Sequence, residues 1–175
     1  MTDIKFSRSP GLLSEAEFVE IFGGVYEHSP WIAQQAWRNG INESHDSVNQ
    51  LAKAFASVLD AADQRQRLDL IISHPDLAGR AAQSGELTDE STSEQASAGI
   101  DQCNQEEFER FQRYNNRYRK KFKFPFVMAV KGSNRHLILT AFEKRLNNNY
   151  QAEFDCAISE IHKIARFRLE DIARR

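Results

Sequence analysis

Apolar residues recur along most of this chain at the spacing of an α-helix. The clearest stripe comprises Val48, Leu51, Phe55, Val58, Leu59 and Ala62. A second stripe near the C-terminus comprises Phe154, Ala157, Ile158, Ile161, Ala165 and Ile172. Positions three and four apart share one face of a helix, so each stripe predicts an amphipathic helix. Since no paired strand patterns and no repeats accompany them, we expect an all-α fold, a bundle of about seven to nine helices.

Local signals predict where the helices of the first half begin and end. Residues 14–17 have the Ser-x-x-Glu spacing of a capping box, and the glycine pair at 23–24 should end the helix that follows. A helix over residues 30–38 has proline at its first position, where proline is favoured. A helix over residues 64–73 should end at the His-Pro pair at 74–75, because the residue before proline disfavours the helical conformation.

The second half begins with a polar stretch, residues 79–100, which is poor in bulky apolar groups. We interpret it as a loop that leads into one helix over residues 92–122, whose aromatic residues share a face. Residues 124–130 are apolar and contain a proline, and predict an extended buried segment. Ser133 is expected to cap the next helix, and the asparagines at 147–149 to form the turn before the last one.

Size and charge limit the classes of protein that fit. The 175 residues suit one domain, and we expect a flexible arm at residues 1–9 followed by a single all-α domain at 10–175. A balance of 23 basic and 25 acidic residues argues against a polyanion as the main partner. No apolar run is long enough to span a membrane, and the first residues do not resemble a signal peptide, so we expect a cytoplasmic protein with no membrane partner. The two cysteines and five histidines show no metal-binding spacing, so no metal site is predicted.

His74 is the first candidate for chemistry. It stands at the end of a predicted apolar helix and is held by Pro75, so it would project from a rigid point. A general acid or base must be positioned in this way. A histidine that merely caps the helix end is an equally good interpretation of these residues.

Residues 91–95, Ser-Thr-Ser-Glu-Gln, form a second candidate. Hydroxyls and unpaired backbone amides at a helix start can bind an anion. Glu94 adds an acid or base, and Gln95 adds an amide able to recognise a polar heterocycle. On these residues alone, an ordinary capping box on a solvated helix is the favoured alternative.

Arg168 is the third candidate, because it falls within the apolar stripe of the last helix. A guanidinium on an apolar face needs a partner. It could clamp an anionic substrate, form a salt bridge to a core acid, or lie at the edge of the stripe and extend outward.

Residues 110–123 interleave basic and aromatic side chains, a pattern that can bind nucleic acid. The aromatic residues mostly follow the apolar spacing of the helix, so a core helix with a solvated basic face is favoured. We therefore expect no nucleic-acid partner.

Together these motifs resemble the OHCU decarboxylase family, which acts on 2-oxo-4-hydroxy-4-carboxy-5-ureidoimidazoline (OHCU) in the last step from urate to allantoin. The resemblance spans roughly residues 12–170. It rests on Glu-His-Ser-Pro-Trp at 27–31, His-Pro-Asp-Leu-Ala-Gly at 74–79, the 91–99 segment, Phe-Pro-Phe-Val within 124–132 and Arg168-Leu169. Lys131 stands where the family often has arginine, a change that does not affect the proposed chemistry.

The resemblance implies an all-helical single domain, a homodimer, no cofactor, and a carbon–carbon lyase that converts OHCU to (S)-allantoin. It implies that His74 is the catalytic histidine, Glu94 its acidic partner, and Arg168 a partner for a polar or charged group of the substrate. The substrate contacts it implies are Pro75, Ser91, Thr92, Ser93, Gln95, Phe126, Val127, Met128, Ala129 and Val130.

The alternative is a non-catalytic helical interaction module that uses Pro30-Trp31 and the basic run at 110–123 as a partner surface. The two hypotheses predict different structures. An enzyme needs His74, Glu94 and Arg168 in one pocket, whereas an interaction module would leave them scattered and show an exposed apolar patch.

Overall fold

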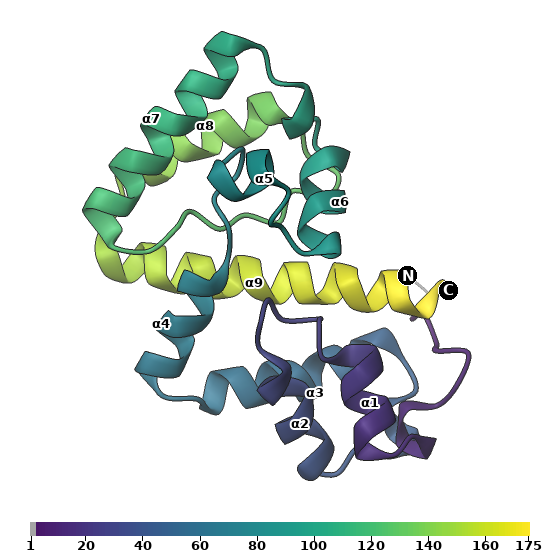
Figure 1. Cartoon of the computed structure of the whole chain (residues 1–175). Helices are drawn as coiled ribbons and strands as arrows, with labels where there is room; N and C mark the ends of the chain where they lie inside the picture. The colour runs from purple at the N-terminus through teal and green to yellow at the C-terminus, as the bar shows by residue number, and fades with distance from the viewer. Residues whose placement is uncertain (1–2) are drawn as a thin grey trace. The chain divides into compact units, whose positions relative to one another are not determined.

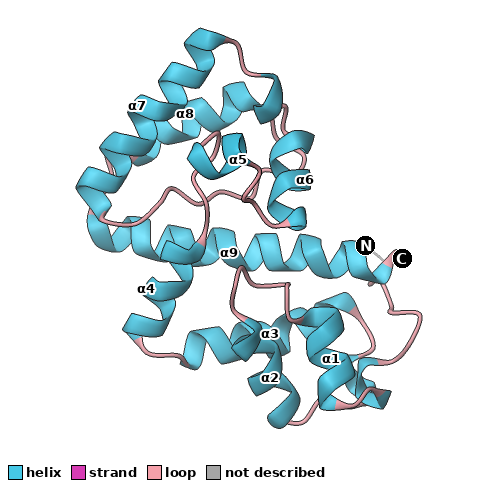
Figure 2. Cartoon of the chain, in the orientation of Figure 1, coloured by secondary structure: helices cyan, strands magenta, loops and turns pink. Residues whose placement is uncertain are grey.

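The structure is a computed structural model that describes residues 3–175. Over these residues the chain consists of helices and loops without a sheet (Figure 2). An isolated β-bridge joins Lys5 to Ser47. The prediction of an all-α fold is confirmed. In the same part of the chain, no helix is both long and apolar enough to cross a membrane. The helices, labelled as in Figure 1, are α1 (Glu15–Phe22), α2 (Pro30–Arg38), α3 (Val48–Ala61), α4 (Gln64–Ser73), α5 (Arg80–Ser84), α6 (Asp89–Ser97), α7 (Gln105–Phe122), α8 (Arg135–Arg145), α9 (Tyr150–Ala173) and the short 3-10 helices η1 (Pro10–Leu12), η2 (Glu43–His45) and η3 (Ile100–Gln102).

The chain divides into two compact units. Unit 1 comprises Met1–Leu70 and Ile161–Arg175, and unit 2 comprises Ile71–Glu160. The boundaries fall inside α4 and inside α9. The single domain expected over residues 10–175 stays a prediction.

Unit 1 has an aromatic core beneath α1, α2 and α3. Phe18 contacts the rings of both Phe22 and Phe55, with ring centroids 4.8 and 5.9 Å apart, and all three side chains are buried. The expected arm, residues 1–9, lies outside the described residues at positions 1–2. From residue 3 onward it pairs with the start of α3, where the Val48 amide donates to the Ile4 carbonyl at 2.8 Å.

The helix ends predicted for the first half are confirmed. Ser14 and Glu17 form the reciprocal capping box at the start of α1, and α2 begins at Pro30. The helix α4 ends at Ser73, directly before the His-Pro pair at 74–75.

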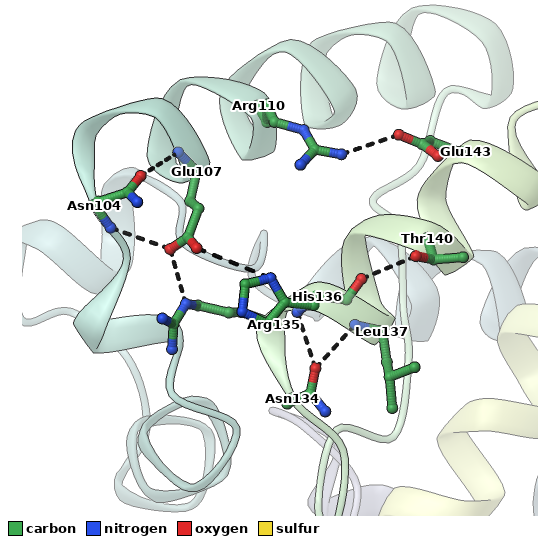
Figure 3. A network of polar contacts seen from close by, with 9 residues as sticks. All are labelled: Asn104, Glu107, Arg110, Asn134, Arg135, His136, Leu137, Thr140 and Glu143. Atoms are coloured by element: carbon green, nitrogen blue, oxygen red, sulfur yellow. Dashed lines mark hydrogen bonds and ion pairs between the residues drawn. The ribbon is translucent and has the colours of Figure 1, made fainter.

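The prediction of one helix over residues 92–122, preceded by a loop, is wrong. Residues 79–100 contain α5 and α6, and η3 separates α6 from α7. The break occurs because Gly99 adopts a left-handed φ of 71° and Asn104 caps a new helix. The Asn104 amide donates to the Glu107 carboxylate at 3.2 Å, and Arg135 Nε donates to the same carboxylate at 2.8 Å (Figure 3).

The cap of α8 is Asn134, one residue after the predicted Ser133. Its side-chain oxygen accepts from the amides of both His136 and Leu137, each at 3.0 Å (Figure 3). A carboxamide oxygen can accept two hydrogen bonds, so Asn134 satisfies two of the orphan donors at the helix start.

The core of unit 2 is aromatic as well. Phe126 stacks on Phe142 of α8, with ring centroids 3.7 Å apart, and contacts Tyr118 of α7 edge-on at 5.3 Å. The sequence predicts that the segment 124–130 is extended and buried. Residues 124–127 and 130 are buried, residues 128–129 are half-buried, and the segment has no regular secondary structure. This packing fixes the side chains at the start of the segment.

Candidate active site

His74 lies at the start of the loop formed by residues 74–79, between α4 and α5. Its side chain is buried, with 6% of the residue exposed, and its amide donates to the Ile71 carbonyl at 3.2 Å. Pro75 is half-buried beside it. Farther along the loop, Ala78 adopts a left-handed φ of 52°, which is uncommon for a residue with a Cβ and must be held by its surroundings.

The 74–79 loop lies against α6, which carries Glu94 and Gln95. The Ala78 amide donates to Gln95 Oε1 at 3.1 Å, and Gln95 Nε2 donates to the Asp76 carbonyl at 3.4 Å. Gln95 is 5% exposed and Glu94 is half-buried. Two motifs that are separate in the sequence are thus brought together within unit 2.

The residues before Glu94 are placed differently from the sequence expectation. The cap of α6 is Thr88, so residues 91–93 lie inside the helix rather than at its start. The amide of Ser91 donates to Thr88 Oγ1 at 3.2 Å, and that of Thr92 donates to the Thr88 carbonyl at 2.9 Å. The amides of Ser91 and Thr92 are therefore paired within the helix, and substrate contacts from residues 91–93 stay a prediction. Ser91 is buried, whereas Thr92 and Ser93 are exposed.

A cavity of about 480 Å³ lies within unit 2 beside the contact between the loop and α6. Ala78, Thr92 and Gln95 contribute to its wall, together with apolar residues such as Ile100 and Phe108. The lining does not include His74 or Glu94.

Two side chains hold the backbone of the segment 124–130, one through a carbonyl and one through an amide. Arg145 Nη1 donates to the Val127 carbonyl at 2.8 Å, and the Ala129 amide donates to Glu160 Oε2 at 2.8 Å. Phe126, Val127 and Val130 are buried, and Met128 and Ala129 are half-buried. Two side chains that the sequence analysis did not single out therefore fix the backbone to which the resemblance assigns substrate contacts.

Arg145 belongs to a buried polar network. Its guanidinium pairs with Glu153 at 2.9 Å and lies 4.2 Å from the centre of the Phe126 ring. The hydroxyl of Tyr118 donates to Glu153, which is fully buried. Desolvation and the hydrogen bond to Glu153 raise the pKa of Tyr118. This network was not singled out in the sequence; the signal that could have found it is Glu153, an acid directly before Phe154 of the apolar stripe of α9.

Arg168 lies on α9 in unit 1 and is 5% exposed. Its Nη1 lies 2.8 Å from Glu27 Oε2 and donates to the Gly24 carbonyl at 3.2 Å. The salt bridge to a core acid, one of the three interpretations of Arg168, is therefore present, and Glu27 comes from the 27–31 motif. His74 and Glu94 belong to unit 2, so a shared pocket with Arg168 stays a prediction.

The exposed large apolar side chains are distributed over five elements rather than gathered on one. Among the described residues they are Leu12, Ile21, Ile72, Leu137 and Tyr150. Such single exposures are normal on globular proteins and do not favour the interaction-module alternative.

Comparison with known proteins assigns the chain to a family. Residues 12–170 match the family model described as OHCU decarboxylase. The chain is 41% identical to a 2-oxo-4-hydroxy-4-carboxy-5-ureidoimidazoline decarboxylase of Haloferax volcanii, over 91% of this chain and 90% of the relative. The protein of the same name from Halalkalicoccus jeotgali is 41% identical over 89% of this chain and 84% of its own length.

Among solved structures, (S)-allantoin synthase superposes with a TM-score of 0.73 at 30% identity. The match covers 93% of this chain but 52% of that one, so this chain spans about half the length of that protein. The sequence matches and the superposition agree with each other. The chain belongs to the OHCU decarboxylase family.

Proposed function

We propose that this protein is a carbon–carbon lyase that decarboxylates OHCU to (S)-allantoin, without a cofactor, as the last step of urate degradation. Family membership supports this assignment, as does the name that curated relatives carry over most of both chain lengths. The structural observation that carries it is the pair of hydrogen bonds between Gln95 and the 74–79 loop, one accepted from the Ala78 amide and one donated to the Asp76 carbonyl. They join the segment that carries His74 to the helix that carries Glu94.

The proposed reaction needs little from the protein beyond orientation and one proton. Loss of CO₂ leaves a carbanion, which the neighbouring imine or carbonyl system of the ring can delocalise. The protein must hold the substrate carboxylate, stabilise the developing charge and deliver a proton to one face of the ring.

His74, paired with Glu94, would polarise the substrate hydroxyl or donate the final proton. Gln95 would fix the ring orientation. A glutamine side chain offers two N–H donors and two acceptor lone pairs, and its hydrogen bonds to the loop use one of each. The remaining donor and acceptor suit the ureido and carbonyl groups of the substrate. The position of Gln95 in the cavity wall is consistent with this role.

Arg168 would pair with a charged or polar group of the substrate, with Glu27 holding its guanidinium. Contacts from Pro75, from Ser91, Thr92 and Ser93, and from residues 126–130 complete the proposal. The amide of Ala129 is already donated to Glu160. Ala129 would therefore contribute to binding through van der Waals contact, or its amide would exchange Glu160 for the substrate as its acceptor.

The decisive variant is His74→Asn. The unstable substrate is generated in situ by urate oxidation and hydroxyisourate hydrolysis, and (S)-allantoin is followed by circular dichroism. We expect the wild type to accelerate its formation and the variant to leave only the spontaneous rate. The matched control is His136→Asn, which changes an exposed histidine. If His74→Asn still accelerates the reaction, His74 is not the catalytic histidine.

We also propose that the protein acts as a homodimer in the cytoplasm, in line with the family resemblance. Light scattering coupled to size exclusion tests the dimer, with a mass of twice 20.1 kDa expected. A monomer at working concentration would contradict it, and cell fractionation tests the location.

A further inference from the structure

Three polar side chains of α7 share one face of the helix and contact three consecutive residues of the 74–79 loop. Gln112, Asn115 and Arg119 are spaced three and four residues apart, which places them in one row along the helix. All of these residues belong to unit 2.

Each of the three side chains contacts a different residue of the loop. Gln112 Nε2 donates to the Ala78 carbonyl at 2.7 Å, and Asn115 Nδ2 donates to the Leu77 carbonyl at 2.9 Å. One turn further along α7, Arg119 Nε donates to both carboxylate oxygens of Asp76, at 2.9 and 3.1 Å. As the loop proceeds from residue 76 to 78, the contacts step back along α7 from 119 to 112.

The loop needs this support for physical reasons. Leu77 and Ala78 are 7% and 5% exposed, so their carbonyls need partners other than water. The left-handed φ of Ala78 is also strained for a residue with a Cβ and persists only where neighbours hold it. The donors from α7, with Gln95 from α6 on the Ala78 amide, supply those partners.

We infer that Gln112, Asn115 and Arg119 are positioning residues for His74, an inference that rests on the proposed function. Pro75 is the one residue between His74 and Asp76, and its ring fixes its own φ, so the position of Asp76 constrains where the backbone places the imidazole of His74. This gives Arg119, within the basic run at 110–123, a role that does not involve nucleic acid.

We call Gln112, Asn115 and Arg119 the clamp residues. The test removes the hydrogen-bond donors of two of them while roughly keeping the size of the side chains. Arg119→Met and Gln112→Met remove one donor group each, from positions that are exposed and half-buried, and Arg117→Met is the matched control on an exposed position of the same helix. We expect kcat to fall roughly ten- to a hundredfold in the two clamp variants, with KM within about twofold, because misplacement of a catalytic group mainly affects the chemical step. Arg119→Lys should recover part of the loss, and Arg117→Met should behave as wild type.

Two further readouts separate positioning from a general loss of structure. Amide exchange of residues 77–79 should accelerate in the clamp variants while amides of α8 keep their wild-type rates. The imidazole NMR signals of His74 should shift or broaden. These readouts do not need the substrate, so they test the clamp even if the wild type fails to accelerate OHCU decarboxylation, an outcome that would overturn the proposed function alone.

The inference is overturned if both clamp variants keep wild-type exchange at residues 77–79 and unchanged His74 signals. A fall in kcat without any change in exchange or in the His74 signals would also overturn it, since the residues would then act other than through the loop. Equal losses in Arg117→Met would overturn it too, since the loss of activity would then not depend on the contacts with the loop.

Discussion

The Arg168 guanidinium lies 2.8 Å from the Glu27 carboxylate, and both side chains are buried. The pair joins the 27–31 motif to α9 within unit 1. Removing two charges from water is costly, and the mutual attraction offsets that cost only while both partners remain. The pair therefore constrains which residues are tolerated at either position, even before any ligand binds.

Glu27→Gln should lower the free energy of unfolding by about 3 kcal/mol, because it leaves a buried guanidinium without its counter-charge. Urea denaturation followed by circular dichroism measures the change. Glu15→Gln is the matched control, since Glu15 pairs with Arg38 at 3.0 Å on the surface. The control should cost less than about 1 kcal/mol.

The double variant Glu27→Gln with Arg168→Gln should cost less than the two single variants added together. It removes both charges, so neither is left unpaired. Additive losses would show that the two residues stabilise unit 1 independently, contrary to the prediction.

Glu153→Gln should destabilise the protein by roughly 3–5 kcal/mol, since it leaves Arg145 buried without its carboxylate. The loss should also loosen the segment 124–130, because Arg145 holds the Val127 carbonyl. Urea denaturation gives the first effect, and hydrogen exchange of the amides of the segment gives the second.

Glu143→Gln is the control for this variant, because Glu143 pairs with Arg110 at 3.1 Å in an exposed position. It should have a much smaller effect on stability and leave the exchange of the segment unchanged. Equal effects of the two substitutions would contradict a special role for the buried network.

Asn134→Ala should cost about 1 kcal/mol of stability, the usual value of a helix N-cap. The side chain of Asn134 accepts two amide hydrogen bonds at the start of α8. Thermal unfolding detects a loss of this size as a shift of a few degrees. Ser133→Ala is the matched control one residue earlier and should leave stability within about 0.5 kcal/mol of wild type. A larger loss of stability in Ser133→Ala than in Asn134→Ala would show that Ser133 is the cap.

Local capping and helix-breaking signals predicted the helix ends of the first half of the chain. Ser14 with Glu17 gave the start of α1, and the His-Pro pair at 74–75 gave the end of α4. Prediction failed at residues 79–104, because α5 and α6 have few large apolar residues and the break between α6 and α7 depends on the left-handed φ of Gly99.

The candidate site shows the same division. His74, Glu94 and Arg168 stood out because each is poorly explained by the packing of its own helix. The pairing of Arg168 with Glu27, and the contacts of Arg145 with the Val127 carbonyl and of Gln112 with the Ala78 carbonyl, did not stand out, since they are tertiary contacts. Long-range pairing of this kind leaves no periodic trace in a single sequence.

Two buried tyrosines should make the protein sensitive to alkaline pH. The pKa of Tyr26 is raised mainly by burial and further by the nearby Asp60 carboxylate, and the pKa of Tyr118 is raised by burial and by Glu153. The folded state therefore keeps both protons above pH 10, whereas the unfolded state releases them near the ordinary pKa of about 10. Stability should be unaffected by these groups below pH 10 and should fall above it.

Each tyrosine should contribute a slope of about 1.4 kcal/mol per pH unit between its unfolded and folded pKa. Urea denaturation from pH 9 to 11 measures this decline in the free energy of unfolding. Tyr26→Phe should reduce the slope by the contribution of one tyrosine. The hydroxyl of Tyr26 contacts His162 Nδ1 at 3.0 Å, so the variant also shows what that hydrogen bond contributes at pH 8. Tyr150→Phe, at an exposed position, is the control. If Tyr26→Phe keeps the wild-type slope, the Tyr26 hydroxyl titrates equally in both states and the expected alkaline weakness has another source.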